Sequence, residues 1–253
     1  MPGILPIHLF TDFGTCGPYV GLLHGALRKA GFSGEIIDLQ HDAPAFDPVA
    51  AGYLLEAMLP HLVQPGLVVA VVDPGVGGAR QGLVVSLPGH RLVGPDNGLF
   101  APLFPLAESI ARIAWQPPGV SATFHGRDWF APVGARLANG DELPLKTLSA
   151  ADCVGNEHGA GERSVIYCDA FGNAMTGIRA AVLPEDVTVC VCGRVIARAR
   201  TFSDVPPGEL LWFENSLGLL ELAVNQGSAV QSLGLRVGDA VTLVAANRTG
   251  GRG

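Results

Sequence analysis

The sequence predicts an α/β fold, in which an N-terminal α/β domain with a largely parallel sheet precedes a smaller all-β domain. Two observations lead to this prediction. In the first part of the chain, short apolar runs alternate with stretches of helical periodicity, which indicates βαβ units. In the second part, short apolar runs are bounded by glycine, proline or aspartate, which is typical of short strands joined by turns.

The expected elements follow one another in a simple order. Residues 1–150 form the α/β domain, residues 151–162 a linker rich in glycine and polar residues, and residues 163–247 the β domain. In the first domain the expected strands are Ile4–Phe10, Glu35–Leu39, Leu67–Val72, Leu83–Ser86 and Arg91–Val93, and the expected helices are Pro18–Ala30, Val49–Leu62, Gly98–Leu106 and Phe130–Asn139. In the second the expected strands are Ser164–Cys168, Val187–Val191, Val195–Ala199, Leu210–Phe213 and Ala240–Val244.

Composition narrows the class of protein. Of the 253 residues, 48% are hydrophobic and 15% charged, which is typical of a compact protein with a large core. The net charge of −7 argues against a nucleic-acid partner, since such proteins concentrate Lys and Arg on one face. The sequence lacks an apolar run of the roughly 18 residues that cross a bilayer, and it begins without a basic leader, so a cytoplasmic location and no membrane partner are expected.

The cysteines do not indicate a metal site. There are five, without the C-x-x-C spacing of a zinc site, and they are interpreted as reduced thiols that pack as small apolar side chains. Neither a cofactor nor a metal is expected. The sequence also lacks the glycine-rich motifs of phosphate-loop and dinucleotide-binding proteins.

Three aspartates follow predicted strands at glycine-rich turns. They are Asp12 in Thr11-Asp12-Phe13-Gly14, Asp73 in the run that ends at Arg80, and Asp96 in Gly94-Pro95-Asp96-Asn97-Gly98. Parallel strands would gather these carboxylates at one edge of the sheet, where α/β domains bind ligands. The alternative is that each aspartate only caps a turn or a helix.

The densest polar cluster of the chain surrounds His125. The run from Thr123 to Pro132 places His125, Arg127 and Asp128 ahead of a predicted helix. The histidines without such neighbours are interpreted as ordinary surface or core residues: His8, His24, His61, His90 and His158.

The second domain contains two further polar segments. They are the runs Cys168–Asn173 and Phe213–Ala223, in which aromatic side chains lie beside Asp and Asn. Such neighbours suit a purine ring, which stacks, and an ammonium group, which takes charge-assisted hydrogen bonds. The alternative for either segment is a β-turn with a core phenylalanine.

These segments together resemble the SAM hydroxide adenosyltransferase family, the S-adenosyl-L-methionine (SAM) hydrolases, which is related to the SAM-dependent fluorinase and chlorinase. The motifs that carry the resemblance occur in the family's order over nearly the whole chain: Thr11-Asp12-Phe13-Gly14 with Pro18-Tyr19-Val20, Val72-Asp73-Pro74-Gly75-Val76-Gly77 through Arg80, Gly94-Pro95-Asp96-Asn97-Gly98, Phe124-His125-Gly126-Arg127-Asp128 through Pro132, Asp169-Ala170-Phe171-Gly172-Asn173, and Asn215-Ser216 with Leu220-Glu221-Leu222-Ala223-Val224-Asn225.

The resemblance implies a barrel-like C-terminal domain and a homotrimer with active sites between subunits. It implies a hydrolase that converts SAM to adenosine and methionine. Asp73, Arg80 and His125 match the family's water-activating set. Of the substrate-binding positions, Asp12 matches the acid that binds the ribose hydroxyls and Asp169 the partner of the methionine ammonium. Phe171 and Asn173 match the adenosine pocket, and Asn215 and Ser216 match contacts to the methionine and adenine ends.

The implied reaction is in-line attack by water on the ribose 5′ carbon, and the proton could pass to Asp73 or to His125. Pairing with Arg80 would lower the pKa of Asp73, which favours His125 as the acceptor. Three other functions stay open: halide transfer, which the Asp/Arg/His set disfavours; a metal-dependent hydrolase with Asp12, Asp73, Asp96 and His125 as ligands; and a sensor that binds SAM or adenosine without converting it.

Overall fold

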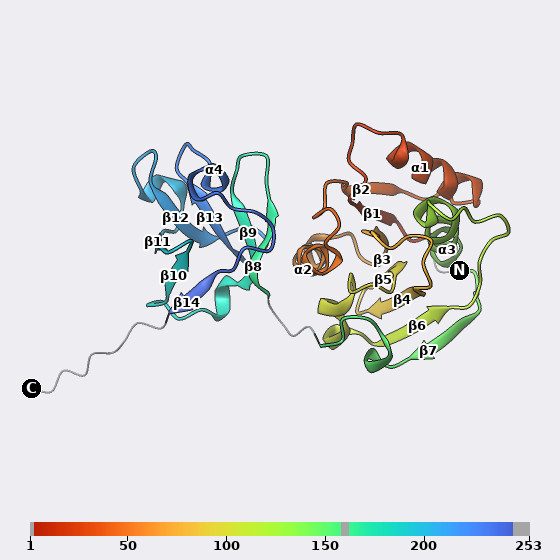
Figure 1. Cartoon of the computed structure of the whole chain (residues 1–253). Helices are drawn as coiled ribbons and strands as arrows, with labels where there is room; N and C mark the ends of the chain where they lie inside the picture. The colour runs from red at the N-terminus through yellow and green to blue at the C-terminus, as the bar shows by residue number, and fades with distance from the viewer. Residues whose placement is uncertain (1–2, 158–161, 245–253) are drawn as a thin grey trace, which may run out of the picture. The chain divides into compact units, whose positions relative to one another are not determined.

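The computed structural model describes residues 3–157 and 162–244 of the chain. Two compact units are present, unit 1 over residues 1–159 and unit 2 over residues 160–253. Figure 1 shows that each unit is built around a sheet of its own. Residues 158–161, which include His158 and the end of the predicted linker, lie outside the described residues, as do residues 245–247 of the predicted second domain.

The sheet of unit 1 is mixed, with strand order β2-β1-β3-β5-β4-β6-β7. Pairing is parallel from β2 to β5 and antiparallel from β5 to β7. The strands are β1 (Ile7–Thr11), β2 (Ile36–Gln40), β3 (Gly66–Val71), β4 (Gly82–Leu87), β5 (His90–Pro95), β6 (Ser109–Ile113) and β7 (Leu145–Leu148).

The prediction of a largely parallel sheet was therefore wrong. Only Pro88 and Gly89 separate β4 from β5. A turn of two residues can join only antiparallel strands, because parallel strands need a crossover of a dozen or more residues. The antiparallel strands β6 and β7 were not predicted. They lie at one end of the sheet, where β7 is largely exposed and has no apolar run to mark it.

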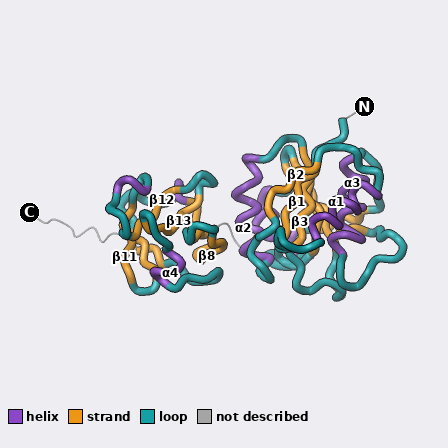
Figure 2. The backbone as a smooth tube through the Cα atoms, turned by 90° about the horizontal axis from the view of Figure 1, so that it is seen from above, coloured by secondary structure: helices purple, strands orange, loops and turns teal. Residues whose placement is uncertain are grey.

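Helices cover both faces of this sheet. Figure 2 shows α2 (Pro48–Met58) on one side of the central strands, with α1 (Tyr19–Lys29) and α3 (Ala131–Ala138) on the other. Helix α2 begins where the side chain of Asp47 accepts a hydrogen bond from the backbone N–H of Ala50, with Pro48 at the first helical position. The predicted helix at 98–106 is instead the 3-10 helix η2 (Ala101–Leu106), which contains two prolines that cannot donate α-helical hydrogen bonds.

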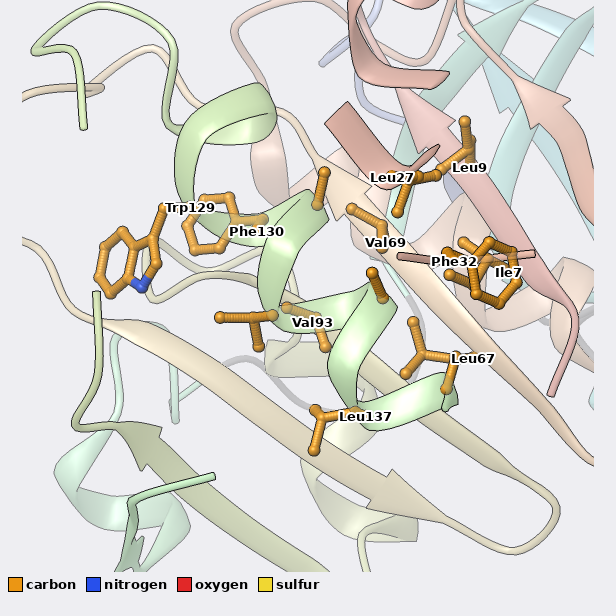
Figure 3. Packing of buried hydrophobic residues seen from close by; sticks show 14 of the residues in the cluster. Ile7, Leu9, Leu27, Phe32, Leu67, Val69, Val93, Trp129, Phe130 and Leu137 are labelled. Carbon is orange, nitrogen blue, oxygen red and sulfur yellow. The ribbon is translucent and has the colours of Figure 1, made fainter. Parts of the chain in front are cut away.

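The central strands are buried on both faces, which explains their continuous apolar runs. All six residues of β3 are buried, as expected of a parallel strand between two helical layers. Figure 3 shows one of these faces, where Leu67 and Val69 of β3 pack beside Leu27 of α1 and Leu137 of α3.

Two histidines lie inside this core. His8 of β1 is 1% exposed and His90 of β5 is 5% exposed, and their ring centroids are 6.4 Å apart. None of their four ring nitrogens has a hydrogen-bond partner among the described residues. Burial lowers the pKa of both imidazoles, so both rings are neutral near pH 7.

Unit 2 contains a second seven-stranded sheet, with strand order β14-β10-β11-β12-β13-β9-β8. All its neighbours are antiparallel except β11 and β12. Its elements are β8 (Glu162–Cys168), β9 (Ala174–Arg179), β10 (Thr188–Val191), β11 (Arg194–Arg198), β12 (Leu210–Glu214), β13 (Leu219–Val224), α4 (Ala229–Leu233) and β14 (Thr242–Val244).

The sheet of unit 2 curls into a half-barrel. Its two edge regions meet, because Ser164 of β8 forms a bridge with Ala240, and the N–H of Val165 donates to the carbonyl of Asp239 over 2.8 Å. Strands β9 and β13 were not predicted. Both follow turn segments whose polar residues were interpreted as ligand-binding, so the hairpins that these turns form were not predicted.

The segment predicted as a linker begins with local structure. Ser149 and Asp152 bond reciprocally around the 3-10 turn η4 (Ala150–Asp152). The N–H of Val154 then donates to the buried carboxylate of Asp96 over 2.9 Å, which ties this part of the chain to unit 1. In the part of the chain that is described, no helix is long and apolar enough to cross a membrane.

Candidate active site

The three aspartates predicted at one edge of the sheet follow adjacent strands. β1, β3 and β5 are neighbours and run parallel, so the expected adjacency is confirmed. Asp12, Asp73 and Asp96 each come within two residues after the end of one of these strands. The carboxyl ends of parallel strands share one edge, and ligands bind there in α/β domains.

Asp73 and Arg80 form a largely buried ion pair at this edge. The Nε of Arg80 donates to both carboxylate oxygens of Asp73 at 3.0 Å, and Nη2 donates to Oδ2 as well. Only 4% of the Asp73 side chain and 10% of the Arg80 side chain are exposed. Two aromatic rings, Trp129 at 5.6 Å and Phe130 at 5.0 Å, also lie against the guanidinium. The planar cation is therefore fixed by an anion and by π faces.

His125 joins this ion pair through its Nδ1 atom. Nη2 of Arg80 lies 2.8 Å from Nδ1 of His125. A guanidinium only donates, so Nδ1 must accept, and the proton of the neutral imidazole is then on Nε2. Burial lowers the pKa of His125, and the positive charge of Arg80 lowers it further, so the neutral form prevails at pH 7. Asp73, Arg80 and His125 are called the charged cluster below.

A glycine allows the two loops of the charged cluster to meet. Gly77 lies between Asp73 and Arg80 and has a φ of +83°. A Cβ at this position would lie 2.3 Å from the carbonyl oxygen of Ala122, three residues before His125. Only glycine fits both the conformation and the close approach.

Asn97 is a member of this site to which the sequence assigned no role. Its Nδ2 donates to the carbonyl of Val72 over 2.9 Å and to Oδ1 of Asp73 over 3.4 Å, so it holds the strand end and the carboxylate together. Its position after Asp96 was the only signal. Asp96 is buried, and burial raises its pKa, but its contact with Val154 gives it a tethering role.

Asp12 lies on the same edge, close to an aromatic residue that the sequence did not single out. The backbone N–H of Phe46 donates to Oδ2 of Asp12 over 3.4 Å. Phe46 has a φ of 62°, which is strained for a bulky residue, and is 79% exposed. Burial raises the pKa of Asp12, and the negative charge of Asp73 adds to the rise.

Arg127 and Asp128, also predicted near this site, bond to each other instead. Nε and Nη2 of Arg127 donate to the two carboxylate oxygens over 2.6 and 2.8 Å. The hydrogen bond from Arg127 lowers the pKa of Asp128 to about 2. This half-buried pair supports the loop before His125, since Asp128 also accepts from the N–H of Ser121.

Unit 2 holds a cavity of about 960 Å³ that gathers the remaining predicted residues. Asp169, Phe171, Asn173, Asn215 and Ser216 all line it. Two further aromatic side chains, Phe202 and Phe213, pack on each other at 5.1 Å between ring centroids and also line the cavity. Its walls therefore combine flat apolar surfaces with carboxylate and amide groups.

The turn between β8 and β9 shapes one wall of this cavity. Oδ1 of Asp169 accepts from the N–H groups of Phe171 and Asn173, and Oδ2 accepts from Nδ2 of Asn173. Gly172 takes a φ of +83°, and a Cβ there would lie 2.1 Å from Oγ of Ser228. The tight turn leaves Phe171 81% exposed. An exposed ring on a rigid turn is suited to stack on a planar ligand.

The turn between β12 and β13 shapes another wall. Oδ1 of Asn215 accepts from the N–H groups of Leu217 and Leu219, and Nδ2 donates to Oε2 of Glu221 over 2.8 Å. Most of the hydrogen-bonding capacity of Asn215 is thus used within the turn. Glu221 was quoted in the sequence motif but was given no role.

Among the described residues, three or more His, Cys, Asp or Glu side chains are nowhere grouped as a metal site. Two of the four side chains considered as metal ligands, Asp73 and His125, bond instead to Arg80.

Comparison with known proteins identifies the family. The model of the SAM hydroxide adenosyltransferase N-terminal domain matches residues 7–147, and that of the C-terminal domain matches residues 163–242. The chain belongs to the SAM hydroxide adenosyltransferase family.

Named members of the family are similar over almost their whole length. A protein of Thermus thermophilus named (R)-S-adenosyl-L-methionine hydrolase is 39% identical over 94% of this chain and 99% of its own. A protein of Salinispora arenicola with the same name is 36% identical over 94% of this chain and 97% of its own. Both compact units of the chain thus have counterparts in these relatives.

Solved structures show the same arrangement of elements. An uncharacterized conserved protein from Thermotoga maritima superposes with a TM-score of 0.80 at 30% identity, covering 94% of this chain and 99% of that one. A conserved hypothetical protein from Thermus thermophilus superposes with a TM-score of 0.77 at 36% identity, covering 95% and 100%.

Proposed function

We propose that this SAM hydroxide adenosyltransferase hydrolyses S-adenosyl-L-methionine to adenosine and L-methionine, with water attacking the ribose 5′ carbon. The observation that carries the proposal is the charged cluster, in which Asp73, Arg80 and His125 are joined by hydrogen bonds at the ligand-binding edge of the sheet. Relatives named as hydrolases of the same compound support it.

The attacking water is held from two sides. Nε2–H of His125 donates to the water oxygen, because Nδ1 is occupied by Arg80. The carboxylate of Asp73 accepts a hydrogen of the water. One lone pair of the oxygen is then directed at the 5′ carbon, and this alignment lowers the entropic part of the barrier.

The proton passes to Asp73 rather than to His125. The tautomer set by Arg80 leaves no free lone pair on His125, which reverses the preference drawn from the sequence. Free hydroxide at pH 7 would cost about 12 kcal/mol, from a pKa gap of nearly 9 units at 1.36 kcal/mol each. The proton therefore leaves as the C–O bond forms, when the oxygen becomes acidic enough for an ion-paired carboxylate to accept it.

The leaving group departs without an acid. When the bond between the 5′ carbon and sulfur breaks, the positively charged sulfonium becomes the neutral thioether of methionine. Positive charge therefore passes from sulfur to the attacking oxygen. A dry site favours this step, since water stabilises the localised ion more than the spread charge of the transition state. The aromatic rings of Trp129 and Phe130 against Arg80 keep water from that side.

The remaining predicted residues bind the substrate. Asp12 receives the ribose hydroxyls, and Asp169 binds the methionine ammonium. Phe171 and Asn173 hold the adenosine, and Ser216 contacts the substrate beside Asn215. This assignment is supported by the family's motifs and by the shared cavity of unit 2.

The reaction proceeds without a cofactor or metal, and the protein acts as a homotrimer in which one subunit supplies the charged cluster and the next supplies the cavity of unit 2. Light scattering after size exclusion tests the trimer. A monomer with full turnover would contradict the shared site.

One experiment tests the activity itself. The protein is incubated with SAM in chloride-free buffer with EDTA, and products are separated by chromatography. Adenosine and methionine are expected from the wild type and from Asp141→Asn, an exposed ion-paired control, but not from Asp73→Asn. Intact SAM with the wild type would reject the hydrolase. Activity that returns only with chloride or a divalent metal would identify a halide transferase or a metalloenzyme.

A further inference from the structure

Glu221 is a charged residue in the middle of a buried strand. All six residues of β13 are buried, and Glu221 is 4% exposed while its five neighbours in the strand are apolar. The carboxyl lines the cavity of unit 2. A carboxylate at such a position destabilises the fold unless it is paired, so its presence calls for a partner.

The described protein supplies only a neutral partner. Oε2 of Glu221 accepts from Nδ2 of Asn215 over 2.8 Å. Among the described lining residues, the only other titratable side chain is Asp169, whose negative charge acts on Glu221. Burial, and then the charge of Asp169, raises the pKa of Glu221. Among the described residues that line the cavity, none carries a positive charge.

The missing positive charge identifies the part of the substrate that fits. SAM carries two cations, a sulfonium and an α-ammonium. A sulfonium has no N–H to donate, whereas an ammonium has three, enough for hydrogen bonds to two carboxylates. The amide of Asn215 fixes the direction of one Glu221 oxygen, as the turn of residues 169–173 fixes Asp169.

We propose that Glu221 is a substrate-binding residue that, together with Asp169, binds the α-ammonium group of the amino-acid end of SAM. This inference rests on the proposed function, and it adds a second carboxylate to the one implied by the family's motifs. Glu221 touches no reacting atom, so it contributes to substrate affinity and selectivity and not to the chemical step.

The test is Glu221→Gln, which keeps an oxygen acceptor for Asn215 and removes the charge. KM for SAM is expected to rise roughly ten- to a hundredfold, as for a lost charged hydrogen bond, with kcat nearly unchanged. Inhibition by adenosine, which has no ammonium, is expected to stay the same. Glu214→Gln, an exposed acid on the same hairpin, is the matched control and keeps the wild-type KM.

A second ligand, which lacks the ammonium group, tests the contribution of that group directly. For a SAM analogue whose α-amino group is replaced by hydrogen, wild type and Glu221→Gln are expected to have the same KM. An unchanged KM for SAM in Glu221→Gln, or an equal loss with the analogue or with adenosine, would overturn the proposal. If the wild type leaves SAM intact, the hydrolase function fails separately. Calorimetric binding of SAM to both proteins then tests Glu221 without turnover.

Discussion

The charged cluster of unit 1 and the cavity of unit 2 both place carboxylates in partly enclosed sites, but they balance charge differently. In unit 1 Arg80 balances the charge of Asp73, so the charged cluster has no net charge, and its hydrogen bonds fix its geometry without a ligand. In unit 2 Asp169 and Glu221 share a cavity whose described lining residues include no cation. A neutral, rigid site suits chemistry, and a site with unbalanced negative charge suits the binding of a cation.

This contrast implies a division of labour. In the proposed mechanism the hydrogen bonds of the charged cluster act on the attacking water, so changes there should lower kcat. In the same proposal the cavity of unit 2 holds parts of the substrate that do not react, so changes there should raise KM.

The largest effect is expected for Arg80→Lys. Lysine keeps the positive charge, but it cannot bind both oxygens of Asp73 and Nδ1 of His125 with one planar group. We expect kcat to fall roughly a hundred- to a thousandfold, with KM much less affected. Steady-state adenosine formation measures both constants, and circular dichroism checks the fold. A variant with near wild-type kcat would mean that charge alone suffices.

Substitution of His125 distinguishes a donor from a base. Glutamine can place an N–H near the position of Nε2, so His125→Gln should keep more activity than His125→Ala, by about tenfold. If His125 were the base, the two variants would be equally impaired.

The pH dependence of wild-type activity is a second test of the role of His125. Its pKa lies below 6.5, so the ring stays neutral as pH falls past 6.5 and is protonated only at lower pH. Protonation puts a hydrogen on Nδ1 against Arg80 and breaks the cluster. We expect the acid limb of kcat/KM to lie below pH 6.5 and to move in His125→Gln. A limb above pH 6.5 in the wild type would contradict this.

Phe171→Ala examines the other site. Phe171 is 81% exposed and lines the cavity, so loss of its ring should cost little stability but remove a stacking surface for the adenine. We expect KM for SAM and the inhibition constant of adenosine to rise about tenfold together, at constant kcat. A fall in kcat alone would place the ring in the chemical step. Phe46→Ala removes an exposed aromatic ring beside Asp12 of unit 1, and its KM and kcat can be compared with those of Phe171→Ala.

The smallest effect on activity is expected at His8 and His90, which lie toward the amino ends of β1 and β5, away from the charged cluster. Because the pKa of both histidines is lowered in the folded state, the unfolded chain binds protons at a higher pH than the folded protein does. The folded state therefore loses stability as pH falls below 6.5. His90→Leu should reduce this loss, so that Tm changes less between pH 7 and 5 at unchanged kcat. A Tm that is equally pH-dependent in wild type and variant would exclude these rings as the cause.

Sequence reasoning succeeded where a local pattern decides the structure. The buried parallel strands are continuous apolar runs, and a run followed by Asp and Gly places Asp12 and Asp73 at strand ends. It failed where the partner is remote in sequence. The pairing of β6 with β4 and β7 has no local sign, and neither has the contact between Asp96 and Val154, which are 58 residues apart.

The same limit applied to individual site residues. Nothing in the run around Arg127 and Asp128 shows that they pair with each other while His125 turns to Arg80. The tautomer of His125 required the position of a guanidinium 45 residues away. Glu221 was visible as the single acid of an apolar strand, but a buried strand had to be recognised before that acid became unusual.

His125 caps η3 (Gly126–Phe130), a single π-helical turn that runs directly into α3. Such a turn holds about one residue more than an α-helical turn, and single π turns of this kind are frequent at functional sites. Deleting one residue from this turn would rotate everything before it by about 100° around the helix axis, and the imidazole would turn away from Arg80 while the body of α3 kept its packing.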